Sequence, residues 1–311
     1  MNTAAVITSY IEHNRGLGKR FRCEGGVLLA FSRSIGDTLL HKIQPAMITR
    51  FIDREGTRDI TKRKKYLVLE RFFRLSVARG RLKVSPVPIT KWKRSSPART
   101  PYIYSEGELK QLLAAVPEAT AGQSHIDAET LRTYLLLLYG AGLRRGEARR
   151  LELGDIDLAQ SLIQVRETKF FKTRIVPLGA SLKTTITPFV TKRRKSAVDG
   201  EALFTKRNGK PLSDSAIGSV FKRLRRIAGI AREGDARNQP RLHDLRHSAA
   251  VHRVISWYRS GADVNDLLPM LATYLGHRDL SGTQHYLTMT EELLTEASRR
   301  FEAFARGTRH G

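Results

Sequence analysis

The pattern of apolar and polar residues predicts a chain built mostly from helices. The clearest case runs from Thr61 to Arg79, where Tyr66, Leu69, Phe72, Phe73 and Val77 recur at three- and four-residue steps. This spacing places them on one core-facing side of a helix, while basic residues fill the other side. Three shorter helices are predicted before it, at Ala4 to His13, Gly25 to Ser34 and Pro45 to Asp53.

A basic, proline-rich segment separates these helices from the rest of the chain. Gly80 ends the long helix, and the stretch SPVPITKWKRSSPARTP that follows contains four prolines. Proline breaks helices and strand ladders alike, so this stretch is predicted to be a linker. The pattern therefore predicts a helical domain over residues 1–86, a linker over 87–104 and a second domain over 105–311.

The second domain is predicted to be mainly α with a small antiparallel β-sheet (α+β). Its first helix begins at Ser105, where S-E-G-E matches a capping box. Two runs with alternating β-branched residues, SLIQVRET and TRIVPLG, predict an antiparallel hairpin. The helices predicted in this domain are Ser105 to Leu113, Glu129 to Tyr139, Arg145 to Leu151, Leu182 to Lys195, Asp214 to Ala228, Asp244 to Ser256, Val264 to Leu275 and Glu291 to Ala305.

The charge of the chain indicates a polyanionic partner. There are 55 Lys and Arg against 30 Asp and Glu, a net charge of +25 with a pI near 10.7. The charge is spread along the chain without a basic amphipathic anchor, which favours nucleic acid over a membrane surface. The alternative is a charged face that only meets solvent. The residues predicted to follow a DNA backbone are Lys62, Arg63 and Lys65 of the long helix, and Lys91, Lys93 and Arg94 of the linker.

Several other functions are disfavoured by the sequence. Cys23 is the only cysteine, which argues against a disulfide framework and suits a reducing cytoplasm, where we expect the protein to act at the nucleoid. The first residues do not resemble a signal peptide, and the apolar run Tyr134 to Leu143 is shorter than the roughly 20 residues of a membrane span. No phosphate-binding glycine loop is present, and Asp155 and Asp157 fit turn and capping positions. We therefore expect no metal and no cofactor.

Tyr286 is the candidate nucleophile. It ends the stretch LATYLGHRDLSGTQHY, and a phenol with a pKa of about 10 needs a positively charged pocket around its target. Arg144 follows a glycine break in AGLRRGE, and Glu147 lies three residues on, where it can brace Arg144 or Arg145. His243 and Arg246 are spaced i and i+3 at a predicted helix start, so both side chains can meet one ligand.

A lysine in the predicted hairpin completes the candidate set. Lys169 falls at the hairpin tip, where a long amine can reach outward, and Lys172 is the rival position. Each of these residues is a weak signal alone. His247 beside the i, i+3 pair is expected to pack or hydrogen-bond locally.

In this order the residues resemble the tyrosine recombinase (phage integrase) family. GLRRGE is similar to its first arginine motif, TKFFKTRIVPL to its hairpin lysine motif, LHDLRHS to its His-x-x-Arg box, and YLGHRDLSGTQHY to its final His and Tyr box. His277 and Tyr286 are nine residues apart, the spacing associated with this family. The likeness covers residues 100 to 300 well and suggests a simple two-domain, Xer-like or transposon-resident type.

The resemblance implies the role of each residue. Tyr286 would attack a DNA phosphodiester to give a 3′-phosphotyrosyl link and a free 5′-hydroxyl. Arg144 and Arg246 would bind the non-bridging oxygens and stabilise the pentacoordinate transition state. The remaining roles are a general acid, a proton acceptor for the tyrosine and a hydrogen-bond donor to the phosphate, held by Lys169, His243 and His277 respectively.

The resemblance also implies an assembly on double-stranded DNA. Four protomers would join two sites and exchange strands through a Holliday junction. The last predicted helix has an apolar stripe, including Leu293, Leu294 and Phe301, whose partner would be a neighbouring subunit, with docking on its own domain as the alternative. Two other functions fit part of the pattern: relaxation of DNA by a type IB topoisomerase, and DNA binding without catalysis.

Overall fold

The chain folds into two compact units, Met1–Ala98 and Arg99–Gly311. The computed structural model describes residues 1–90, 100–122, 124–166, 173–196, 201–234, 238–277 and 291–307. The division between the units falls inside the segment 87–104 that the sequence predicts to be a linker.

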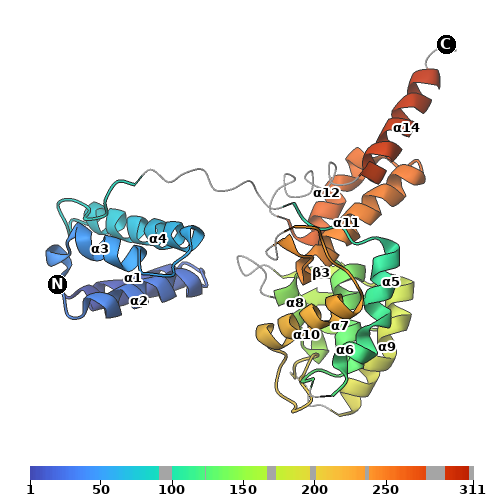
Figure 1. Cartoon of the computed structure of the whole chain (residues 1–311), viewed down its shortest axis with the longest axis horizontal. Coiled ribbons are helices and arrows are strands. Elements are labelled where there is room, and N and C mark those ends of the chain that lie inside the picture. Colours follow the sequence, from blue (N-terminus) through green and yellow to red (C-terminus); the bar gives the residue numbers. More distant parts are fainter. Residues whose placement is uncertain are drawn as a thin grey trace. The chain divides into compact units, whose positions relative to one another are not determined.

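The first unit is a small bundle of helices (Figure 1). Its helices are α1 (Thr3–Gly16), α2 (Arg22–Ile35), α3 (Pro45–Ile52) and α4 (Asp59–Ala78), with a short 3₁₀ turn η1 (Leu40–Lys42) between α2 and α3. All four predicted helices are confirmed. The predicted stripe of α4 supplies Leu69, Phe72 and Phe73 to the core, and the Phe73 ring meets the Phe31 ring of α2 edge-on at 6.2 Å.

The second unit is mainly helical with one small sheet, as predicted (Figure 1). Strands β1 (Ile156–Asp157), β2 (Leu162–Val165) and β3 (Arg174–Pro177) pair antiparallel in the order β1-β2-β3. The helical segments are α5 (Glu106–Ala114), α6 (Val116–Thr120), α7 (Ala128–Gly140), α8 (Arg145–Arg149), η2 (Leu153–Asp155), α9 (Ala180–Lys195), α10 (Asp214–Ile227), α11 (Leu242–Arg259), α12 (Val264–Leu275) and α14 (Glu291–Gly307).

The first helix of this unit, α5, begins at a capping box. The Ser105 hydroxyl accepts a hydrogen bond from the Glu108 amide at 3.2 Å, and the Glu108 carboxylate accepts one from the Ser105 amide at 2.8 Å. The predicted capping box is therefore confirmed. Strand β1 and helix α6 are additional to the predicted elements, because two and five residues are too short to show a hydrophobic period.

Helix α7 lies at the centre of this unit and leads the chain into the site. Leu131, Leu135 and Leu138 are buried, and α7 packs against α9 and α11. The Tyr134 hydroxyl donates to the backbone carbonyl of Arg145 at 2.7 Å. The core thereby fixes the chain just where α8 begins.

Helix α14 packs only part of its apolar stripe on its own unit. Leu293 is buried against α11, and Arg259 of α11 forms ion pairs with Glu292 and Glu296 of α14. Leu294 and Phe301 are exposed. The first turns of α14 therefore dock on their own unit, which was the alternative. Other apolar residues of the stripe face outward.

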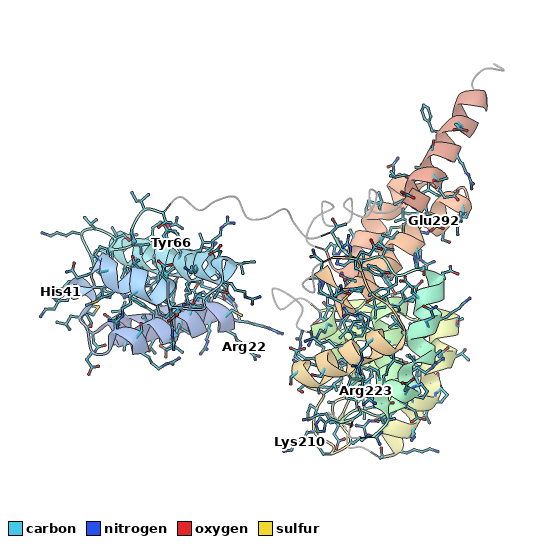
Figure 2. The ribbon with its side chains drawn as sticks, in the orientation of Figure 1. Arg22, His41, Tyr66, Lys210, Arg223 and Glu292 are labelled. Carbon is cyan, nitrogen blue, oxygen red and sulfur yellow. The ribbon has the colours of Figure 1, made fainter. Side chains whose placement is uncertain are left out.

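Basic side chains lie at the surface of both units (Figure 2). Arg22 at the start of α2, and Lys210 and Arg223 in the second unit, are exposed. None of the helices in the described part of the chain is both long and apolar enough to cross a membrane.

Candidate active site

A tight turn after α7 places Arg144 in the site. Gly142 has a φ of +57°, in the left-handed region that glycine adopts without strain. A Cβ at Gly142 would lie 2.8 Å from Cδ2 of Leu275, so glycine also allows the turn to approach the end of α12. Arg144 then takes the N-cap position of α8, as its place before a predicted helix implied.

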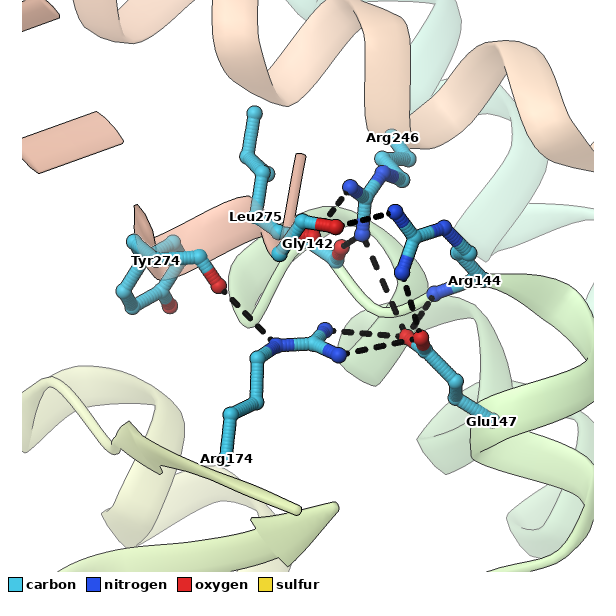
Figure 3. Close-up of polar contacts among 8 residues, drawn as sticks. Gly142, Arg144, Glu147, Arg174, Arg246, Tyr274 and Leu275 are labelled. Carbon is cyan, nitrogen blue, oxygen red and sulfur yellow. Dashed lines mark hydrogen bonds and ion pairs between the residues drawn. The ribbon is translucent and has the colours of Figure 1, made fainter. Parts of the chain in front are cut away.

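Glu147 in the first turn of α8 holds the arginines of the site together (Figure 3). Its buried carboxylate accepts hydrogen bonds from the backbone amide of Arg144 at 2.9 Å and from Nη1 of Arg144 at 2.7 Å. Arg174 of β3 adds a two-pronged contact, from Nη1 to Oε1 at 3.0 Å and from Nη2 to Oε2 at 2.9 Å. The predicted brace on Arg144 is therefore confirmed.

These contacts keep Glu147 ionised. Burial alone would raise the pKa of its carboxyl group, but the hydrogen bonds and charges of Arg174 and Arg144 outweigh burial and lower the pKa to about 2. A carboxylate that stays charged can orient guanidiniums at every physiological pH.

Arg246 lies at the floor of the site in the first turns of α11. It is 1% exposed, and its two terminal nitrogens donate to the backbone carbonyls of Gly142 and Leu275. Its Nη1 is 4.0 Å from Oε2 of Glu147, a longer contact than those of Arg144 and Arg174. Arg246 thus joins α11, the glycine turn and α12 in one place.

The last turn of α12 presents three successive backbone carbonyls to the site. Each accepts a hydrogen bond from a different arginine: Tyr274 O from Nε of Arg174 at 3.2 Å, Leu275 O from Arg246, and Gly276 O from Nη2 of Arg144 at 2.6 Å. Carbonyls at a helix C-terminus lack helical partners and carry partial negative charge, which suits cations. The end of α12 therefore gathers three guanidiniums (Figure 3).

His243, His247 and His277 lie beside this cluster. His243 and His247, on successive turns of α11, meet edge to face with ring centroids 4.7 Å apart. Burial, aided by the charge of Arg246, lowers the pKa of His243. Burial, together with the neighbouring His243 and the charge of Arg246, lowers the pKa of His247 to about 3. His277 follows α12, where its amide donates to the Ala272 carbonyl at 2.8 Å. The local packing expected for His247 agrees with this position.

The other predicted residues belong to the first unit or lie outside the described residues. On α4, Lys62 forms an ion pair with Asp53 at 3.0 Å, and Lys65 donates to the Phe51 carbonyl at 2.8 Å with its amine 4.6 Å from the centre of the Phe51 ring. Both hold α4 to the end of α3, whereas Arg63 is exposed. Outside the described residues lie Lys91, Lys93, Arg94, Lys169, Lys172 and Tyr286.

Asp155 and Asp157 have structural roles. Asp155 accepts a hydrogen bond from the Glu152 amide at 2.9 Å, and Asp157 accepts one from the Gln160 amide at 2.8 Å. Both are turn and capping residues, as predicted. Among the described residues, no group of three His, Cys, Asp or Glu side chains could hold a metal ion.

Arg174 is the site residue that the sequence did not single out. It shares one face of β3 with the buried Val176, because side chains alternate along a strand. A charged residue in register with buried ones indicates a buried partner, and this signal was present in TRIVPLG.

Comparison with known proteins decides the family. Residues 104–292 match the model described as the phage integrase family. The chain is also 33% identical over 306 residues to y4rB of Sinorhizobium fredii, whose name describes an integrase/recombinase, and the match covers 96% of each chain. The chain belongs to the phage integrase family.

Solved tyrosine recombinases share its fold. The Tn1549 transposon integrase superposes with a TM-score of 0.65 at 16% identity, covering 96% of this chain and 99% of the other. A lambda integrase fragment superposes with a TM-score of 0.63 at 20% identity, covering 94% and 97%. The resemblance drawn from the motifs is thereby confirmed, with the same architecture of helices and a small antiparallel sheet.

Proposed function

We propose that this phage integrase family member is a site-specific DNA recombinase that cuts and rejoins strands through a 3′-phosphotyrosyl intermediate. Tyr286 attacks the scissile phosphodiester, and the leaving 5′-oxygen takes a proton from Lys169. The bond energy is kept in the phosphotyrosyl link, so strand rejoining needs neither a nucleotide nor a metal ion.

The observation that carries this proposal is the arginine cluster around Glu147. Three guanidiniums, those of Arg144, Arg174 and Arg246, surround one ionised carboxylate and leave a net charge of +2. A phosphodiester gains negative charge on its oxygens as it becomes pentacoordinate. Positive charge fixed in advance in a partly buried site stabilises that state without reorganisation.

Arg144 and Arg246 have different positions relative to such a phosphate. The Arg144 side chain is 32% exposed, so it lies at the open side of the cluster and is suited to contact non-bridging oxygens. Arg246 is buried behind it, and its charge acts through a medium that screens poorly. Together they form the proposed phosphate clamp.

A neutral imidazole in the site supports the proton transfer. Because the pKa of His243 is lowered, the ring is unprotonated at neutral pH and can accept the phenolic proton of Tyr286. Burial raises the pKa of Tyr104, Tyr134 and Tyr274 in the same unit, which makes them poor nucleophiles. These tyrosines are thus no rivals to Tyr286.

DNA and partner subunits complete the proposal. The solved lambda integrase is bound to a core site, and the solved Tn1549 integrase is in complex with circular intermediate DNA. The net charge of +25 suits the same class of ligand here. We infer a tetramer on two sites that exchanges strands through a Holliday junction, with the exposed Leu294 and Phe301 of α14 meeting a neighbouring subunit.

The clamp is tested by Arg144→Ala. Losing one preorganised donor costs about 3 kcal/mol in the transition state, so strand cleavage should slow by about 100-fold or more while DNA binding persists. The substrate is a bound duplex selected from a random library and nicked near the cleavage point, and the readout is the rate of covalent adduct formation.

Arg145→Ala is the matched control. Arg145 is the next residue along α8, yet its side chain pairs with Asp214 at 3.2 Å and not with Glu147. It should cleave at close to the wild-type rate. Equal rates for Arg144→Ala and the wild type would refute the clamp.

A further inference from the structure

The guanidinium of Arg174 uses all three of its nitrogens in hydrogen bonds to protein acceptors. Nη1 and Nη2 donate to the two oxygens of Glu147 at 3.0 and 2.9 Å, and Nε donates to the Tyr274 carbonyl at 3.2 Å. Its side chain is 13% exposed, compared with 32% for Arg144. Contacts of all three nitrogens with protein acceptors suit a group that holds protein in place (Figure 3).

We propose that Arg174 is a positioning residue for recombination: it occupies Glu147 so that Arg144 and Arg246 keep the geometry that binds the scissile phosphate. The inference rests on the proposed function, in which those two arginines form the clamp. Arg174 itself does not contact the reacting atoms.

Arg144 and Arg174 share the two oxygens of the Glu147 carboxylate. Oε1 accepts from Nη1 of Arg144 at 2.7 Å and from Arg174, while Oε2 accepts from the Arg144 amide at 2.9 Å and from Arg174. The planar fork of Arg174 fixes the plane of the carboxylate, because two parallel hydrogen bonds define its orientation. One oxygen is then left pointing at each of the Arg144 donors.

Without Arg174 the carboxylate would be a buried charge short of partners. Such a charge draws in the nearest cation, since leaving it unpaired is costly. The nearest remaining cations are Arg144, which already contacts Oε1 at 2.7 Å, and Arg246, which has its Nη1 4.0 Å from Oε2. Moving either toward Glu147 takes it away from the phosphate position.

The contact with Tyr274 extends the effect to α12. Through Nε, Arg174 joins β3 to the helix end that also receives Arg144 and Arg246. Gly276 makes room for this, because a Cβ there would lie 3.1 Å from Nη1 of Arg174. Arg174 therefore sets the spacing between the strand, the helix end and Glu147.

The first test compares Arg174→Gln and Arg174→Lys with the wild type. Displacement of reacting groups by about 1 Å costs roughly 100-fold in rate, so we expect cleavage by Arg174→Gln at saturating nicked duplex to fall by about that factor. The dissociation constant for the duplex should change little. Arg174→Lys should regain part of the rate, because lysine restores the charge but not the fork.

Arg193→Gln is a control matched for burial and contacts. The Arg193 side chain is 19% exposed, lies 3.8 Å from the Glu201 carboxylate and donates to the carbonyls of Ala202 and Leu203. It makes the same kinds of contact as Arg174 but touches no residue of the cluster. A loss of rate specific to Arg174→Gln separates positioning from a general loss of stability.

The second test is a double-mutant cycle with Glu147→Gln. If Arg174 acts through Glu147, the double variant should cleave no more slowly than the slower single variant. Fully additive losses, or equal rates for Arg174→Gln and Arg193→Gln, would overturn the positioning role while the wild type still forms the adduct. If the wild type forms no adduct on DNA that it binds, the proposed recombinase function fails, and the role of Arg174 fails with it.

Discussion

Glu147 carries one negative charge at the point where three guanidiniums meet. Its carboxylate is buried and ionised, with contacts of 2.7 to 3.0 Å to Arg144 and Arg174 and a longer one to Arg246. Arginine is suited to such a place because its fork can bind a carboxylate on one side and face a phosphate on another. Glu147 thus holds the guanidiniums of the site together.

At the scale of single residues, His247 predicts a pH effect on stability. Its pKa is about 3 in the folded chain and about 6.5 when unfolded, so the unfolded chain takes up the proton first as the pH falls. Stability contributed by the neutral ring is therefore present above about pH 6.5 and lost below it. The expected loss approaches about 1.4 kcal/mol per pH unit for this one imidazole.

Urea unfolding between pH 7.5 and 5 measures this effect. A Trp92→Phe background leaves Trp257 of α11 as the only tryptophan, so fluorescence reports on the second unit. The His247→Gln variant should lose less stability than the parent below pH 6.5. The same pH dependence in both proteins would show that His247 is protonated freely in the folded chain.

The sequence pointed to some residues of the candidate site and not to others. Arg144, Glu147, His243 and Arg246 were found because motifs and i, i+3 spacing are local signals. Arg174 was not found, because its role depends on a contact with Glu147 across 27 positions and on the end of α12. Long-range ion pairs of this kind leave only a faint trace in the chain itself.

At the scale of elements, the end of α12 is the feature on which the site depends. The helix ends at Gly276 in the left-handed conformation, with φ +67° and ψ +43°, and its last carbonyls receive three arginines. Helix ends are read well from sequence when glycine marks them, and α12 was predicted with its observed bounds, Val264 to Leu275. The sequence did not predict that three arginines meet at this helix end, because they come from three distant segments.

Gly276→Ala tests the close approach at this helix end. Gly229 after α10 has the same φ of +67°, but a Cβ there would meet nothing within 4 Å, whereas a Cβ at Gly276 would lie 3.1 Å from Arg174. Both substitutions should cost about 1 kcal/mol for the left-handed backbone. Gly276→Ala should cost more and should also slow cleavage.

Thermal unfolding and adduct formation on the two variants give the comparison. Gly229→Ala should keep close to the wild-type cleavage rate. If the two variants lost equal stability and cleaved equally fast, the packing of Gly276 against Arg174 would have no bearing on the site.

At the scale of the whole molecule, the two parts of the chain differ in charge and in the site that they contain. Residues 1–104 hold 22 Lys and Arg against 7 Asp and Glu, although they are a third of the chain. The second unit contains the arginine cluster and the part of the chain that matches the phage integrase family. The helices and the hairpin were predictable because hydrophobic periods are local, while partner subunits and the DNA sequence leave no such period.

The most direct test of the proposed chemistry is to map the covalent link to DNA. The wild-type protein is incubated with a bound, nicked duplex in EDTA, denatured, digested and analysed by mass spectrometry, with Tyr286→Phe as the control. We predict a DNA adduct on Tyr286 in the wild type and none in Tyr286→Phe, although that variant still binds the duplex. An adduct that persists in Tyr286→Phe, or cleavage of bound DNA without any adduct, would contradict the account.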